Sequence, residues 1–500
     1  MSATPPGPSP DGGARGEAVA SARAAEAVGE EAGAVRPGRS ERYWCEWALL
    51  DAGAGAAAAP GVLVEVDGGA ITSVTRDTRP PDGAERLGGL TVAGFADAHS
   101  HAFHRALRGR TGEDGGSFWT WRSRMYEAAG RLDPDSYHRL ARAVYAEMAL
   151  AGITCVGEFH YLHHAPGGTR YNDPNAMGRA LIAAAADAGV RITLLDTCYL
   201  AGGLDARSGY TPLEGPQLRF GDASADAWAE RVAALRPAAD HARIGVAAHS
   251  VRAVPPADLA RIARAAPEAG WAAAHIHASE QPAENTACIA AHGRTPVRLL
   301  DDTGFLTALR PTLVHATHLT RADASLVRGT GAGVCLCPTT EGDLADGLPD
   351  LGRLAGAPLS LGTDGHTGID MFAEARGAEI HERLRTGRRG TLPAHGLLEA
   401  ALAGGHAALG WEPDAEPGGE GGAGRIAAGA RADLVTVALD GVRMAGFEGD
   451  RAADALVWAA TAADVRHVMA DGRWIVRDGV HTAIPDAAAR LHAAITELTR

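Results

Sequence analysis

Two histidines separated by one residue, His99 and His101, follow an apolar run from Thr91 to Phe95. On an extended strand, residues two positions apart project from the same face, so both imidazoles can reach one point. Imidazole nitrogens that converge in this way are part of many sites for divalent metal ions. The pair is equally compatible with a polar loop, so a metal site requires further ligands elsewhere in the chain.

Apolar segments that end in polar residues recur along the central region of the chain and alternate with segments of helical spacing. In 135–151, for example, apolar side chains follow one another at helical intervals. The eight polar strand ends are 98–101, 158–161, 196–197, 248–250, 275–277, 315–318, 337–340 and 362–365. Eight strands alternating with helices predict a (β/α)8 TIM-like barrel, with catalytic groups at the C-terminal strand ends. An open doubly wound sheet is the alternative, but no glycine-rich nucleotide loop follows the first strand.

Short strand patterns flank this region on both sides and predict a second, smaller domain. They occur at 44–50, 62–66 and 71–75, and again at 432–437, 465–470 and 474–477. We therefore expect the two chain ends to pair into a small β-sandwich. The expected organisation is a disordered extension at 1–40, the N-terminal half of the β-domain at 41–92, the barrel at 93–415, and the C-terminal half of the β-domain with a final helix at 416–500, its 416–424 segment an exposed loop.

Composition restricts the function classes. The formal charge of −14 argues against non-specific nucleic-acid binding, and no apolar stretch reaches the roughly 20 residues that span a bilayer. Six scattered cysteines without zinc-knuckle spacing, and the absence of an apolar leader, predict a cytoplasmic protein. The chain contains no lysine, which excludes a Schiff-base lysine, a P-loop lysine and a lysine carbamate that bridges two metals.

In a closed barrel the polar strand ends meet at one mouth. His99 and His101 come from the first strand, His277 from the fifth and Asp364 from the eighth. Three histidines and one aspartate around an open position predict a mononuclear catalytic site, with Zn²⁺ the best-fitting ion.

The order His-x-His, His277-x-x-Glu280, His315 and Thr363-Asp364 resembles the single-metal deaminase branch of the amidohydrolase superfamily. The resemblance covers roughly residues 43–480. It implies that Asp364 both ligates the metal and accepts a proton from the attacking water. It further implies that Glu280 passes a proton to the departing nitrogen and that His315 stabilises the attacking oxygen. His318 competes with His315 for this role, and strand position favours His315.

Longer stretches of the chain resemble the formimidoylglutamate deiminases of histidine degradation. They are 99–103 (HSHAF), 117–122 (SFWTWR), 158–164 (EFHYLHH), 249–254 (HSVRAV) and 337–341 (CPTTE). This resemblance implies hydrolysis of N-formimidoyl-L-glutamate to N-formyl-L-glutamate and ammonia by a homodimer.

A dicarboxylate amidine needs partners of both charges. Arg122 and Arg252 can bind carboxylates through bidentate guanidinium forks, and Tyr161 and His249 are hydrogen-bonding partners implied by the resemblance. His104 stands where the family often has glutamine, and a histidine differs from an amide in reach and charge. A related formimidoyl amino acid therefore stays open as the substrate. Two more distant functions also stay open: a mononuclear-zinc deaminase of a purine-like or guanidine-like substrate, and an inactive metal-binding scaffold.

Overall fold

The structure, a computed structural model, describes residues 40–111, 118–235, 239–412 and 421–500. The expected extension at 1–40 therefore lies almost wholly outside the described residues, as does most of the expected loop at 416–424. Among the described residues, none of the helices combines the length and the apolar character that crossing a bilayer requires.

The central element is an eight-stranded parallel sheet that confirms the expected barrel. Its strands are β5 (Phe95–Ser100), β6 (Ile153–His160), β7 (Arg191–Cys198), β10 (Ala242–Ala248), β11 (Ala274–Ala278), β12 (Thr312–His315), β13 (Gly333–Leu336) and β14 (Leu359–Leu361). Each strand pairs in parallel with the next in this order. The first and last strands meet through a parallel bridge between Ser100 and Asp364, which closes the barrel.

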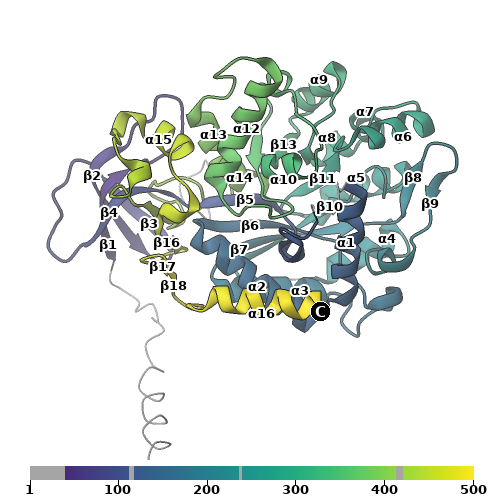
Figure 1. The fold of residues 1–500 in the computed structure, drawn as a ribbon, viewed down its shortest axis with the longest axis horizontal. Coiled ribbons are helices and arrows are strands. Elements are labelled where there is room, and N and C mark those ends of the chain that lie inside the picture. Colours follow the sequence, from purple (N-terminus) through teal and green to yellow (C-terminus); the bar gives the residue numbers. More distant parts are fainter. Residues whose placement is uncertain (1–39, 112–117, 236–238, 413–420) are drawn as a thin grey trace, which may run out of the picture. The chain divides into compact units, whose positions relative to one another are not determined.

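Helices follow the strands and surround the sheet (Figure 1). They are α1 (Phe118–Arg131), α2 (Pro134–Leu150), α3 (Ala176–Ala188), α4 (Ala225–Ala234), α5 (Pro256–Ala269), α6 (Pro282–His292), α7 (Pro296–Asp302), α8 (Phe305–Leu309), α9 (Arg321–Thr330), α10 (Pro338–Asp343), α11 (Leu351–Leu354), α12 (Met371–Thr386), α13 (Ala394–Ala401) and α14 (Ala403–Ala408). Helix α2 shows how the sequence specifies them: Asp133 caps its N-terminus with Ser136, Pro134 occupies the first turn, and its apolar stripe is buried.

A second eight-stranded sheet is built from both chain ends and fits the expected small β-sandwich. Its strands are β1 (Glu41–Ala48), β2 (Ala59–Asp67), β3 (Ala70–Thr75), β4 (Glu85–Ala93), β15 (Leu434–Val437), β16 (Val465–Ala470), β17 (Arg473–Arg477) and β18 (Val480–His481). The two ends join where β4 pairs antiparallel with β15. Helix α15 (Ala452–Trp458) lies between β15 and β16 in sequence, and the C-terminal helix α16 (Ala487–Thr499) packs against α2 (Figure 1).

The apolar run that leads into His99 belongs to two sheets. Thr91 lies in β4 of the small sheet, whereas Phe95 begins β5 in the barrel. Gly94 separates them at a point where a Cβ atom would lie 2.2 Å from the Thr154 hydroxyl oxygen, so only glycine fits. The chain therefore passes from the small domain into the first barrel strand within one residue.

Candidate active site

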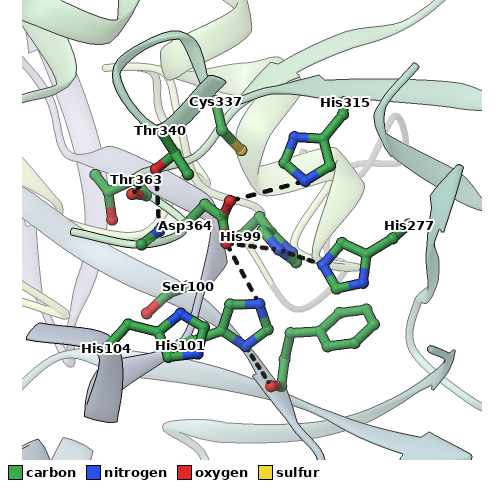
Figure 2. A network of polar contacts seen from close by, with 12 residues as sticks. His99, Ser100, His101, His104, His277, His315, Cys337, Thr340, Thr363 and Asp364 are labelled. Atoms are coloured by element: carbon green, nitrogen blue, oxygen red, sulfur yellow. Dashed lines mark hydrogen bonds and ion pairs between the residues drawn. The ribbon is translucent and has the colours of Figure 1, made fainter. Parts of the chain in front are cut away.

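Four buried side chains converge at the C-terminal end of the barrel. Asp364 Oδ1 lies 3.4 Å from His99 Nε2 and 3.3 Å from His101 Nε2. The Nε2 atoms of His99 and His277 are 3.0 Å apart. These four residues form one group that could hold a metal ion, with one ligand atom from each (Figure 2).

The ring orientations fit a cation at this point. His101 Nδ1 lies 3.0 Å from the carbonyl oxygen of Phe159, and His277 Nδ1 lies 3.0 Å from that of His249. Carbonyls only accept hydrogen bonds, so each Nδ1 carries the proton and each Nε2 a lone pair. Burial lowers the pKa of His101 to about 3, which keeps the ring neutral. Its unprotonated Nε2 then faces a carboxylate oxygen, an arrangement that a bound cation satisfies and a hydrogen bond does not.

Backbone hydrogen bonds between residues of this group close the barrel. The Asp364 N–H donates to the His99 carbonyl at 2.9 Å, and the His101 N–H donates to the Asp364 carbonyl at 3.3 Å. Asp97, on β5, accepts from both the N–H and the hydroxyl of Thr363. Asp364 has a positive φ of 42°, a conformation that costs a non-glycine residue roughly 1–3 kcal/mol. The neighbouring strands hold the carboxylate in this strained position.

Two further predicted residues lie beside the metal-ligand group. His315 Nε2 is 3.7 Å from Asp364 Oδ2 and 3.9 Å from Glu280 Oε1. Its Nδ1 is 3.3 Å from Glu341 Oε1. Burial alone lowers the pKa of His315, but the hydrogen bond to Glu341 and the charges of Glu280 and Asp364 raise it well above its usual range. His318 instead directs Nε2 to the Asp346 carbonyl at 2.7 Å, so the geometry favours His315.

A cavity of about 440 Å³ opens above these residues. It is lined by all five residues predicted to bind substrate, namely His104, Arg122, Tyr161, His249 and Arg252. His104 Nε2 and the Tyr161 hydroxyl lie 3.0 Å apart. Burial lowers the pKa of His104 well below its usual range, so the ring is neutral, as a glutamine amide is. Among the five residues predicted to bind substrate, the two arginines supply the positive charge.

Both predicted carboxylate-binding arginines already have partners. Arg252 donates to Glu280 Oε2 at 2.8 Å and lies 3.8 Å from Glu284 Oε2. Arg122 donates to the Tyr126 hydroxyl at 2.6 Å and to the Gly202 carbonyl at 3.3 Å. A substrate carboxylate therefore has to share or replace these contacts.

Some buried carboxyls at the site escaped prediction from the sequence. Glu284 accepts from the Glu280 N–H at 3.1 Å, and its position four residues after Glu280 was the signal that could have found it. Glu158, in the motif 158–164, accepts from the Ser100 hydroxyl and from the Ala102 N–H behind the histidine pair. Burial raises the pKa of Glu158 to about 8. Strand alternation places this carboxyl behind the sheet and not in the cavity.

A second buried cluster contains His160, His163 and Asp196. The Asp196 carboxylate is already engaged by Arg231, at 2.7 and 2.9 Å, and by the Trp228 indole N–H at 3.0 Å. A guanidinium that occupies both oxygens disfavours a cation there. This cluster supports the segment that carries Tyr161 into the cavity.

Comparison with known proteins places these residues in a family context. The Amidohydrolase family matches residues 90–475. A formimidoylglutamate deiminase of Pseudomonas aeruginosa is 37% identical over 452 residues, 87% of this chain and 96% of the relative. A 5-methylthioadenosine/S-adenosylhomocysteine deaminase of Halobacterium salinarum is 30% identical over 87% of this chain and 92% of its own length. The crystal structure of an amidohydrolase from Brucella melitensis has a TM-score of 0.82 and 32% identity, and covers 92% of this chain and 100% of its own.

Proposed function

This chain belongs to the amidohydrolase family, and we propose that it hydrolyses N-formimidoyl-L-glutamate to N-formyl-L-glutamate and ammonia. The observation that carries the proposal is the lining of one cavity. The lining includes members of the group able to hold a metal ion, the carboxylate of Glu280, and both Arg122 and Arg252. An amidine with two carboxylates needs this combination of charges.

We propose that His99, His101, His277 and Asp364 hold one divalent ion, with Zn²⁺ the expected species. Bound there, the ion supplies Lewis acidity, which makes water a nucleophile near neutral pH. Asp364 accepts a proton from the attacking water through Oδ2, the oxygen turned towards His315. His315, charged and held by Glu341, donates a hydrogen bond to the oxygen that adds to the formimidoyl carbon.

Glu280 carries the proton that leaves with ammonia. Its Oε1 faces His315 while Arg252 holds its Oε2. The proton released by the attacking water passes from Asp364 to Glu280, and the Glu280 carboxyl then protonates the nitrogen as the C–N bond of the tetrahedral carbon breaks. The remaining hydroxyl proton passes to Asp364 as the carbonyl of the formyl product forms. Arg252 and Arg122 bind the two carboxylates of the substrate and set the distance from them to the reacting carbon.

One feature of the cavity favours a second candidate function, the deamination of a purine-like ring. The walls include five aromatic side chains, Trp121, Tyr126, Tyr161, Tyr199 and Phe220, on which a flat heterocycle could stack. One relative, matched over 92% of its length, is named 5-methylthioadenosine/S-adenosylhomocysteine deaminase. The arginines favour the dicarboxylate, because a neutral purine leaves both of them without a partner of opposite charge in the ligand.

The test is ammonia release by the zinc-loaded protein from N-formimidoyl-L-glutamate, its aspartate analogue, guanine and 5-methylthioadenosine. We expect release from the glutamate compound, lost on chelation and restored by zinc. Preference for the aspartate analogue assigns the pocket to a shorter dicarboxylate. The histidine at position 104, where the family often has glutamine, allows such a difference in substrate. Turnover of a purine alone contradicts the proposal.

The compartment and the oligomeric state complete the proposal. The six cysteines are all free and buried, which suits a reducing cytoplasm. We propose a cytoplasmic homodimer that binds neither nucleic acid nor membrane.

A further inference from the structure

The two oxygens of Asp364 face different groups of side chains. Oδ1 lies within 3.4 Å of His99 and His101, whereas Oδ2 lies 3.7 Å from His315 Nε2. On the Oδ2 side, the thiol of Cys337 joins His315 and Asp364 in a second buried group whose ligand atoms all lie within 4.8 Å of one another. Figure 2 shows the sulfur of Cys337 on the side of Asp364 that faces His315, away from the three-histidine group.

One carboxylate, Glu341, fixes both of the other members of this second group. Glu341 Oε1 is 3.3 Å from His315 Nδ1 and accepts the Cys337 backbone N–H at 2.9 Å. A carboxylate partner at Nδ1 turns Nε2 towards the centre of the group, as it does in established histidine–metal sites. Glu280, Glu341 and Asp364 also surround the single imidazole, so the charges there favour an added cation.

The donor set decides which ion fits. Nitrogen, thiolate sulfur and carboxylate oxygen together suit Zn²⁺ and Cd²⁺ and do not suit Mg²⁺ or Ca²⁺. Ligands at about 2.0–2.3 Å from one tetrahedral ion lie roughly 3.3–3.8 Å apart. The observed separations need only small side-chain movements, on the order of an ångström, to reach this geometry.

We propose that His315, Cys337 and Asp364 form a second, weaker subsite for a soft divalent ion, which shares Asp364 with the catalytic ion and inhibits the enzyme. The Cys337 thiol and Nε2 of the charged His315 ring each lose a proton to solvent as their bonds to the metal form. Affinity is lower than at the first site because three protein ligands are present and one carboxylate is shared. The inhibitory effect rests on the proposed function, since the second ion takes Oδ2 of Asp364 and Nε2 of His315 away from the reaction.

The test separates binding from activity. Protein loaded with one equivalent of Zn²⁺ is titrated with Cd²⁺ while ultraviolet absorption from thiolate-to-cadmium charge transfer is recorded without substrate. The first group contains no sulfur, so this absorption reports the second group. Cys337→Ser is expected to abolish it. The matched control is Cys335→Ser, because Cys335 lies two residues earlier, is equally buried and stands outside the ligand group. Thermal unfolding checks that both variants fold.

Activity supplies the second readout. Excess Zn²⁺ should inhibit the parent enzyme and Cys335→Ser, and Cys337→Ser should need at least tenfold more Zn²⁺ for the same inhibition. Absence of a charge-transfer band, or a band that survives in Cys337→Ser, overturns the proposal. Equal inhibition of all three proteins overturns the inhibitory role. The absorption measurement needs no substrate, so its outcome is independent of whether formimidoylglutamate is turned over.

Discussion

Replacement of Glu280 by glutamine tests the proton-transfer step directly. The amide keeps the shape of the side chain and an oxygen that can accept the 2.8 Å hydrogen bond from Arg252, but it cannot carry a proton. Glu284 still balances the charge of Arg252 at 3.8 Å, so the local fold should persist. Loss of a general acid costs about 10²–10⁴ in rate, or roughly 3–5 kcal/mol of transition-state stabilisation.

The measurements are kcat and KM for N-formimidoyl-L-glutamate, together with metal content by elemental analysis. We expect kcat to fall by this factor with KM changed by only a few-fold, and metal content to stay unchanged because Glu280 is outside the ligand group. The matched control is Glu284→Gln, which removes the other carboxylate from the same arginine. If kcat falls equally in both variants, the loss comes from leaving the charge of Arg252 with one carboxylate fewer and not from the missing proton donor. Near-normal turnover by Glu280→Gln would falsify the proton-transfer role.

Four further predictions concern substrate binding, stability, its pH dependence and the N-terminal segment. Arg252→Met should raise KM for the dicarboxylate at least tenfold more than for a formimidoyl amine without carboxylates, and equal increases would remove the assignment. Arg191→Met should lower the free energy of unfolding at pH 7 by about 3–5 kcal/mol, because it leaves the buried Asp433 carboxylate unpaired; a loss below about 1 kcal/mol in denaturant titrations would contradict this. Burial raises the pKa of Asp433, but Arg191 outweighs this effect and sets the pKa at about 2. The parent protein should therefore lose roughly 2–3 kcal/mol of its free energy of unfolding as the pH falls from about 5 to 1, and Arg191→Met should lose less. Deletion of residues 2–38 should leave kcat/KM unchanged, since every proposed site residue lies at position 99 or beyond, and a loss of activity in the purified deletion protein would contradict the interpretation.

The barrel could be predicted from the sequence because the patterns that indicate its strands and helices are local. Apolar runs with polar ends mark strands, and alternation places His99 and His101 on one face. The sequence did not predict that the apolar run from Thr91 to Phe95 is split between two sheets. That split depends on the close approach of Gly94 to Thr154, which lies far along the chain on the next barrel strand. The sequence analysis also did not predict strand β4, because its pairing partners come from both ends of the chain.

The site was predictable in its residue types and less so in its pairings. His277, Glu280 and Asp364 follow from strand-end positions and the family resemblance. That Arg252 bridges Glu280 and Glu284 depends on how the loop after β10 meets the start of α6, which no local pattern reports. The choice between His315 and His318 likewise depends on the backbone: a positive φ of 69° at His315 turns the two rings to different partners.

The closure of the barrel also orders events during synthesis. Asp97 and Thr363, which join the first and last strands, are 266 residues apart. At about 5–20 residues per second, a ribosome needs roughly 13–53 s to make the intervening chain. For much of that time the nascent protein presents two histidines of the metal-ligand group without the carboxylate. A chain interrupted before Asp364 lacks both a closed barrel and a complete ligand set, so an aborted fragment cannot become a partially active enzyme.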